Sequence, residues 1–294
     1  MTVIPFIDAG TYLFRFMDPR SPHFWPAVVD MLSGTELFLN SRTKFNDPYD
    51  SQPIIVRDLP NSAIRSYVQE AIENPLNPKR SPLSTVRLLH LKASGRTHFN
   101  KKNIEDIKSG VFQSAKEYLD SAGLLSFSLT AENPLLWGHY AASFTGLCAI
   151  FRRGNSSSSA LSLSAKVLYV DKRPQLPLSL MHELARRRRA DINFDEIATE
   201  IFFLSFLHKS NHWAYEQEAR IFYPFHAYKK LSFDPNELIG FILAPNSPPD
   251  LEKKMREEIA ARRPSVSLDR SKLSQTDFRI IIPHKFSQHC ATAA

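Results

Sequence analysis

The sequence predicts an α+β fold in a single domain covering residues 1–294. Segments with the apolar alternation of β-strands occur along the whole chain, and helical segments separate only some of them, while direct loops join the others. A regular parallel α/β fold would instead place a crossover, usually a helix, between successive strands. No Pro- or Gly-rich linker of domain-separating length interrupts the 294 residues.

The first forty residues are predicted to form a strand, a helix and a second strand. The helix precedes Gly34, a residue type that favours the end of a helix. The next region, from about 61 to 121, has its apolar residues at helical spacing and is predicted to be a helical insertion between β elements. The predicted segments are residues 12–16, 24–32 and 36–40, and the helical faces are Ile64, Val68 and Ile72, and Ile107, Val111, Ala115 and Leu119.

After this insertion the strand pattern returns. The segment 146–151 is almost entirely apolar, which predicts a central strand. The Ser-rich stretch 155–164 predicts an exposed loop. Strands are predicted at 124–129, 146–151, 166–170, 215–223, 239–243 and 278–282, and helices at 195–208 and 249–262.

Composition favours a soluble, cytoplasmic protein with an anionic partner. The longest apolar runs are far shorter than a membrane span, no secretory signal is recognisable, and the two cysteines are too few for a disulfide framework. The net charge of +7 favours nucleotides, nucleic acid or phosphorylated surfaces without choosing among them. The dense basic run Arg186 to Arg189 is either a solvated helix end or a nucleic-acid contact. The nine glycines form no phosphate-binding loop, so dinucleotide-binding and P-loop folds are not expected.

Arg15 is the first candidate site residue. It lies in an aromatic strand in which Tyr12, Phe14 and Phe16 share one face, while Leu13 and Arg15 share the other. A buried arginine without a partner costs several kcal/mol, so Arg15 is expected to be exposed at an edge, ion-paired or bound to a ligand.

A second polar cluster surrounds Pro48. Asn46 and Asp47 before a proline are typical of a turn whose side chains cap backbone groups. Asp47 and Asp50 could also serve a metal-dependent nuclease, but no histidine–carboxylate pair has recognisable ligand spacing, so no metal is expected.

The third cluster offers hydroxyls and aromatic rings. Ser126 and Ser128, followed by Thr130, alternate with apolar residues, so they line one strand face and could hydrogen-bond a polar ligand. Trp137 and Tyr140 lie three residues apart on one helix face, where they form either an aromatic wall or part of the core.

The fourth cluster contains two carboxylates. In a strand, Glu216, Glu218 and Arg220 would share one face. Neighbouring carboxylates repel unless cations offset them, and perturbed carboxylates are functional candidates. A surface ladder of ion pairs is the alternative.

These four clusters, in this order, resemble the bacterial domain-of-unknown-function family two-nine-seven-one. The matching blocks are Tyr12 to Arg15, Phe45 to Pro48, Ser126 to Ser128 with Trp137 to Ala141, and Trp213 to Arg220. The first block departs from the family pattern at Leu13 and Phe14, and Ala219 stands where tryptophan is frequent. The resemblance covers nearly the whole chain and names no reaction.

The order of Arg, Ser-x-Ser and Glu-x-Glu is also similar to the Arg-Ser-Glu signature of ADP-ribosyltransferases. That resemblance implies a compact, mainly antiparallel split sheet that binds NAD as substrate. It implies that Arg15, with Tyr12 beside it, binds the NAD phosphates, that Ser126 or Ser128 positions the nicotinamide ribose, and that Trp137 or Tyr140 stacks on the nicotinamide. Glu218 would stabilise the ribosyl cation, and Glu216 would orient or deprotonate the acceptor.

The sequence therefore leaves two main functional hypotheses. One is an NAD-consuming ADP-ribosyltransferase or NAD glycohydrolase in a toxin or phage-defence role, with a protein, nucleic acid or water as acceptor. The other is a non-catalytic nucleotide or nucleic-acid binding module of a bacterial defence or stress system, favoured by the basic excess.

Overall fold

The computed structural model describes residues 3–66, 101–186 and 196–286, and the chain divides into two compact units. The helical segment expected at 61–121 belongs to unit 1, together with a later stretch of the chain. Unit 1 is Met1–Val3, Ser51–Asp120 and Lys172–His208, and unit 2 is Ile4–Asp50, Ser121–Asp171 and Lys209–Ala294.

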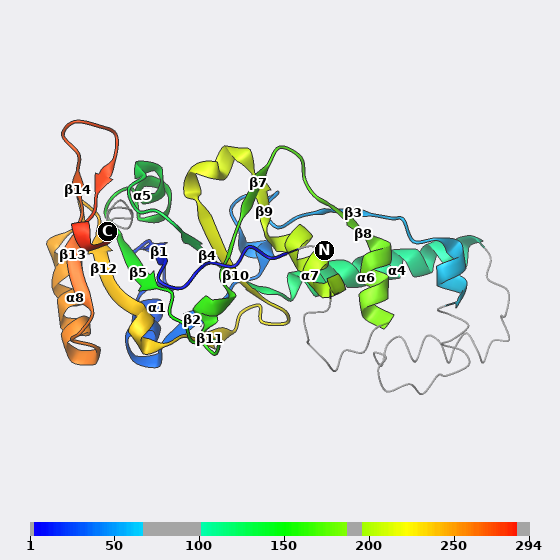
Figure 1. Cartoon of the computed structure of the whole chain (residues 1–294), viewed down its shortest axis with the longest axis horizontal. Helices are drawn as coiled ribbons and strands as arrows, with labels where there is room; N and C mark the ends of the chain where they lie inside the picture. The colour runs from blue at the N-terminus through cyan, green and yellow to red at the C-terminus, as the bar shows by residue number, and fades with distance from the viewer. Residues whose placement is uncertain (1–2, 67–100, 187–195, 287–294) are drawn as a thin grey trace. The chain divides into compact units, whose positions relative to one another are not determined.

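Unit 2 is built on a seven-stranded sheet with the order β13-β12-β5-β1-β4-β10-β6 (Figure 1). All neighbouring strands in it are antiparallel except the parallel pair β12 and β13. The prediction of an α+β protein is confirmed, with a mainly antiparallel sheet. The strands are β1 (Tyr12–Met17), β4 (Gly123–Ser128), β5 (Leu147–Arg152), β6 (Ala165–Lys166), β10 (Glu218–Tyr223), β12 (Leu238–Leu243) and β13 (Ser267–Arg270).

The two faces of this sheet bury different apolar clusters, and β1 contributes to both. Leu13 and Met17 pack with residues of helices α1 and α8 on one face, whereas Phe14 packs with Trp137 of α5 and with Phe286 on the other. This alternation is the one predicted for the strand. The helical segments are α1 (Phe24–Val29), the π-helix η1 (Asp30–Gly34), α5 (Pro134–Tyr140), α8 (Pro249–Arg262) and the 3-10 helix η6 (His284–Phe286).

Several boundaries differ from the prediction. The strand expected at 215–223 is a 3-10 helix followed by a shorter strand, and the one expected at 166–170 is two short strands. The strand expected at 278–282 is reduced to Ile280–Ile281, and β13 was not predicted. The remaining elements of unit 2 are β2 (Glu36–Phe38), η2 (Arg42–Lys44), η3 (Ala160–Leu163), β7 (Leu168–Val170), η4 (Asn211–Glu216), β11 (Lys230–Ser232), η5 (Pro235–Glu237), β14 (Lys272–Leu273) and β15 (Ile280–Ile281), and β9 (His208–Ser210) spans the unit boundary.

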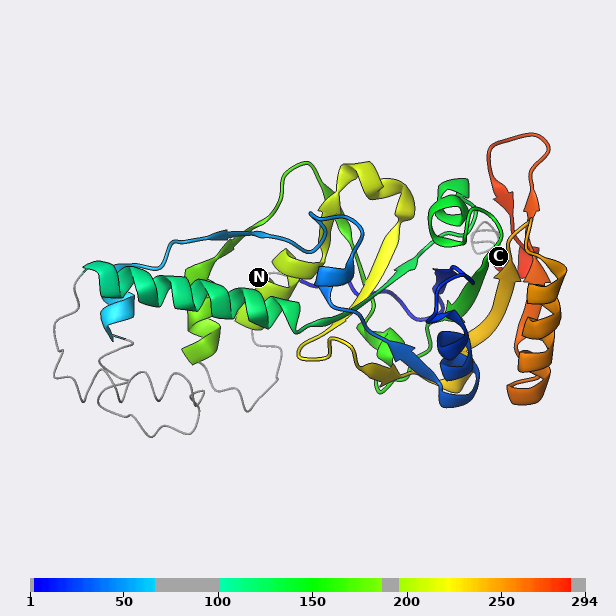
Figure 2. The same ribbon diagram turned by 180° about the vertical axis from the view of Figure 1, so that it is seen from behind.

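Unit 1 is mainly helical (Figure 2). Helix α4 buries Ala115 and Leu119, with Ile107 and Val111 half-buried, as its apolar spacing predicts. The predicted positions Val68 and Ile72 and the basic run 187–189 lie outside the described residues. The elements are β3 (Ile54–Val56), α4 (Lys101–Asp120), β8 (Gln175–Pro177), α6 (Leu178–Arg186) and α7 (Glu196–Phe206), with β3 and β8 paired in parallel.

A membrane-spanning helix is not found among the described residues, because none of their helices is both long and apolar enough.

Candidate functional site

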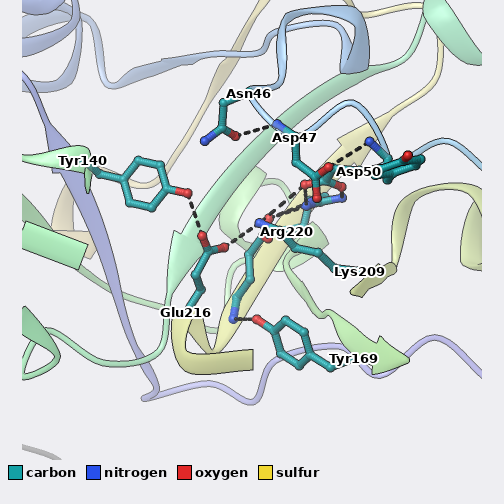
Figure 3. A network of polar contacts seen from close by, with 10 residues as sticks. Asn46, Asp47, Asp50, Tyr140, Tyr169, Lys209, Glu216 and Arg220 are labelled. Carbon is teal, nitrogen blue, oxygen red and sulfur yellow. Dashed lines mark hydrogen bonds and ion pairs between the residues drawn. The ribbon is translucent and has the colours of Figure 1, made fainter. Parts of the chain in front are cut away.

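One face of the unit 2 sheet carries five buried charged side chains, here called the ionic network: Asp50, Lys209, Glu216, Glu218 and Arg220 (Figure 3). None is more than 7% exposed. The Lys209 ammonium lies 2.5 Å from a Glu216 oxygen, 3.0 Å from a Glu218 oxygen and 3.5 Å from an Asp50 oxygen. One lysine is thus shared by three carboxylates.

Arg220 joins two of these carboxylates from β10. Its Nη1 and Nη2 atoms donate to the two Asp50 oxygens at 2.9 and 3.0 Å, a bidentate geometry. Its Nε donates to Glu218 Oε1 at 2.8 Å. The guanidinium also lies over the Phe45 ring, 5.1 Å from its centroid. Both oxygens of Glu218 are therefore bonded to cations, Oε1 to Arg220 and Oε2 to Lys209.

The electrostatic balance keeps both bases protonated. Burial by itself lowers the pKa of Lys209, but the negative charges of Glu218 and Asp50 outweigh burial and raise it above its ordinary value. Burial likewise lowers the pKa of Arg220, and the same two carboxylates raise it further than burial lowers it. The network is consequently held by charged, not neutral, hydrogen bonds.

Glu216 and Glu218 reach Lys209 by different backbone routes. Glu216 is the last residue of η4, and Glu218 is the first residue of β10. The prediction that both belong to one strand is wrong, because Ser210 caps η4 and Gln217 adopts a left-handed conformation with φ 45°. This turn still directs the two carboxylates to the same ammonium.

Two network residues are followed by strained backbone. Gln217 follows Glu216, and Ser51, with φ 56°, follows Asp50. A non-glycine residue in this region costs on the order of 1–3 kcal/mol and persists only where its surroundings over-determine it. Such strain is frequent at functional sites, which makes the network a candidate site.

Tyr140 meets the network at its outer edge. Asn133 caps α5, which ends at Tyr140, and the Tyr140 hydroxyl donates to Glu216 Oε1 at 2.6 Å. Burial and the adjacent Glu216 raise the pKa of Tyr140, so this hydroxyl stays protonated. Asn46, which is exposed, also hydrogen-bonds the Tyr140 side chain. Tyr140 itself is half-buried, so it covers the Glu216 side of the network with a partly exposed side chain.

The predicted serines lie on the network's face of the sheet. The Cα atom of Ser128 is opposite that of Glu218, and Ser126 is opposite Arg220. The Ser128 hydroxyl donates to the Glu216 carbonyl at 2.6 Å, so it fixes the end of η4. Tyr169 acts similarly, because its hydroxyl accepts the Glu218 backbone N–H at 2.7 Å.

Trp137 does not belong to the site. It is fully buried, its indole N–H donates to the Ala131 carbonyl at 2.8 Å, and its ring meets Phe16 edge-on at 5.0 Å. The expectation that Trp137 stacks on a ligand is therefore corrected, because this ring is part of the core. Tyr140, three residues later, is directed to the network instead.

Arg15 lies on the opposite face of the sheet. Phe14 is paired with Ser128 across β1 and β4, so the next residue, Arg15, points the other way. Its side chain lines a small cavity of about 10 Å³ beside Asp30 and Glu36. Burial lowers the pKa of Arg15 to about 10. The structure does not bring Arg15 together with Ser128 and the glutamates, which corrects that part of the predicted site.

Tyr12 is also separate from the network. It shares the face of Phe14, but its hydroxyl donates to the Lys285 carbonyl at 3.3 Å. Its ring contacts Phe286 edge-on, 6.2 Å between centroids. Tyr12 therefore anchors the segment after β15.

The two aspartates near Pro48 have different roles. Asp47 Oδ1 accepts the Tyr49 backbone N–H at 2.8 Å, the capping role that its turn predicts. Asp50 belongs to the ionic network. Within the described parts of the chain, no group of three or more His, Cys, Asp or Glu side chains is arranged to hold a metal ion.

Sequence reasoning missed Lys209 and Tyr169. The neighbouring carboxylates Glu216 and Glu218 could have indicated that a further cation lies nearby, because Arg220 alone does not neutralise two negative charges. Lys209 follows an apolar helix and a histidine, and nothing in that spacing distinguishes it from a surface lysine.

Comparison with known proteins gave no match: no protein-family model, curated protein or solved structure is similar to this chain. Membership of family two-nine-seven-one and the likeness to ADP-ribosyltransferases therefore stay predictions.

Proposed function

We propose that this protein is an NAD-using enzyme of the ADP-ribosyltransferase type, with Glu216 as the carboxylate that faces the substrate. One observation carries the proposal: Lys209 holds one oxygen of Glu216 inside the network, while the other oxygen is bonded, among the residues that the structure describes, only to the neutral hydroxyl of half-buried Tyr140. A substrate hydroxyl can replace that of Tyr140 without breaking an ion pair.

The geometry favours Glu216 over Glu218 for this role. Both oxygens of Glu218 are bonded to cations, Oε1 to Arg220 and Oε2 to Lys209. Releasing Glu218 for a substrate would break two buried ion pairs, one with Arg220 and one with Lys209, and breaking a buried ion pair is strongly destabilising. Glu218 is thus assigned to positioning Lys209, and stabilisation of the ribosyl cation, which the sequence pattern assigns to Glu218, passes to Glu216.

The reaction uses the fixed negative charge of Glu216. The C1′–N bond between ribose and nicotinamide breaks, its electron pair leaves with nicotinamide, and positive charge develops on the ribose ring. A pre-oriented carboxylate stabilises that charge, as in glycoside hydrolysis. An acceptor hydroxyl or water then forms the new C1′–O bond and transfers its proton to Glu216.

Lys209 holds the Glu216 carboxylate in one orientation. A carboxylate that could rotate would lose its effect on the ribosyl cation. The proposal includes Ser128, which fixes the Glu216 backbone, and excludes Arg15 and Trp137. The NAD phosphates need other groups than Arg15, on the network's side of the sheet.

The test is nicotinamide release from NAD labelled in the nicotinamide ring, by purified protein with and without cell lysate. The unaltered protein should release nicotinamide, and Glu216→Gln should lower the rate at least 100-fold, as expected for loss of a group that acts in the transition state. A melting curve and a circular dichroism spectrum like those of the unaltered protein establish that Glu216→Gln is folded. No release with any lysate rejects the proposal. Transfer of labelled ADP-ribose to lysate protein or nucleic acid separates a transferase from a glycohydrolase.

A further inference from the structure

The Tyr140 hydroxyl lies where the proposed reaction needs its acceptor (Figure 3). It donates to Glu216 Oε1 at 2.6 Å, while Lys209 binds the other oxygen, Oε2. In the proposed function Glu216 takes the proton of the acceptor hydroxyl, and a general base must lie within about 2.6–3.2 Å of the group whose proton it takes. Tyr140 meets this requirement with no movement of the chain.

The Tyr140 oxygen has a second partner that suits a nucleophile. Burial and Glu216 raise the pKa of Tyr140, whereas the hydrogen bond with the Asn46 side chain acts in the opposite direction. A donor to a phenol oxygen stabilises negative charge on it, so Asn46 assists the loss of the proton as a new bond forms. Asn46 is exposed and Tyr140 is partly exposed, so neither side chain is sealed in the core.

The backbone that carries Tyr140 is fixed at both ends of α5. Asn133 caps the start of the helix, and the Gly146 N–H donates to the Ala141 carbonyl at 2.8 Å just after its end. Three successive residues of this turn have left-handed backbone, with φ of 51°, 52° and 67° at Ala142, Ser143 and Phe144. Such residues persist only where their surroundings over-determine them. The end of α5 is thus held in one place, which keeps the Tyr140 hydroxyl on Glu216.

A fixed position gives Tyr140 an advantage over dissolved acceptors. Well-oriented groups within one molecule react as if at effective concentrations that reach about 10⁵–10⁸ M, far above that of any dissolved hydroxyl, water included. An external acceptor must also displace Tyr140 from Glu216 before it can lose its proton there. Tyr140 is therefore the acceptor that a ribosyl cation at Glu216 meets first.

We propose that the protein modifies itself by transferring ADP-ribose from NAD to the hydroxyl of its own Tyr140. The inference rests on the proposed function and names one acceptor of the same site. The C1′–N bond breaks and its electron pair leaves with nicotinamide, the Tyr140 oxygen forms the new C1′–O bond, and its proton passes to Glu216. The attached ADP-ribose then lies at Glu216, so the modified protein turns over no further NAD.

The test is mass spectrometry of the whole purified protein and of its peptides after incubation with NAD, without lysate. The unaltered protein should gain one ADP-ribosyl group, located on Tyr140, and its nicotinamide release should slow after a single turnover per molecule. Tyr140→Phe removes only the hydroxyl, so this variant should stay unmodified and continue to release nicotinamide, with water as acceptor. The matched control is Tyr215→Phe: Tyr215 is half-buried and precedes Glu216 in η4, and this variant should be modified on Tyr140 as the unaltered protein is.

Three results would overturn the proposal: nicotinamide release by the unaltered protein with no adduct, an adduct on another residue, or a modification rate per molecule that rises with protein concentration, which would place the acceptor in a second copy. Peptide mapping of the unaltered protein decides the matter even where a melting curve shows that Tyr140→Phe is unfolded. The failure of this inference is release without modification of Tyr140. Absence of release rejects the proposed function and this inference with it.

Discussion

Arg15 and Ser128 lie on opposite faces of one sheet, since Phe14, which precedes Arg15, is the residue paired with Ser128. Three motifs that follow the order of an NAD-binding signature are therefore not gathered at one place. The face of Ser128 carries Glu218 and Arg220, and the face of Arg15 carries the packing of α1. The charged residues that do come together are those of the ionic network.

The position of Arg15 predicts that its charge is dispensable. Its guanidinium is desolvated and forms no ion pair with any described residue, so Arg15→Met should raise the free energy of unfolding by about 1 kcal/mol. Urea unfolding monitored by circular dichroism measures this. A loss of more than about 1 kcal/mol would show that the charge has a partner that stabilises the fold.

Lys209 is predicted to be among the most sensitive positions in unit 2. Lys209→Met leaves three buried carboxylates facing one another with one cation fewer, and should lower the free energy of unfolding by about 3–5 kcal/mol. Lys229→Met is the surface control, with an expected effect within about 0.5 kcal/mol. Chemical unfolding of both variants gives the comparison. Equal effects in the two would mean that the network contributes nothing to stability.

The raised pKa of Lys209 sets the direction of a pH effect. A base whose folded pKa lies above the ordinary value of 10.5 stabilises the fold fully below pH 10.5 and loses that contribution as pH rises further. The difference in unfolding free energy between the unaltered protein and Lys209→Met should shrink above pH 10.5, by at most about 1.4 kcal/mol per pH unit. Urea titrations from pH 8.5 to 11.5 test this. A difference that grows with pH would contradict it.

Gln217 is predicted to tolerate glycine and to reject β-branched residues. Its left-handed backbone suits glycine, so Gln217→Gly should change the free energy of unfolding by less than about 1 kcal/mol. Gln217→Val should lower it by about 1–2 kcal/mol and displace Glu216 from Lys209. Thermal melts rank the two variants. Equal stability of the two would show that the left-handed turn is absent in solution.

Local patterns predicted much of the sheet. The alternation of Tyr12 to Phe16 gave the correct faces of β1, and the apolar run before Arg152 gave a strand that lies inside the sheet. The helix from Pro249 to Arg262 was predicted with its observed ends. Each of these three features depends on residues that are close in sequence and belong to the same strand or helix.

Long-range pairing could not be predicted in the same way. Whether Arg15 and Ser128 share a face depends on the register between β1 and β4, and a shift of one residue would change the answer. The turn at Gln217 depends on the cap from Ser210 and on the carbonyl of Ala214. The prediction that Glu216 belongs to a strand takes neither contact into account. Lys209 is a network residue only because other segments bring their carboxylates to it, and its own sequence position does not predict those contacts.

The most direct measurement is nicotinamide release from NAD by Glu216→Gln and Arg15→Met side by side, with melting curves to confirm that both are folded. If the substrate lies at the ionic network, Glu216→Gln loses at least 100-fold in rate and Arg15→Met retains the rate of the unaltered protein. A folded Arg15→Met variant that loses turnover, or a Glu216→Gln variant that keeps it, would contradict the placement of the site on this face of the sheet.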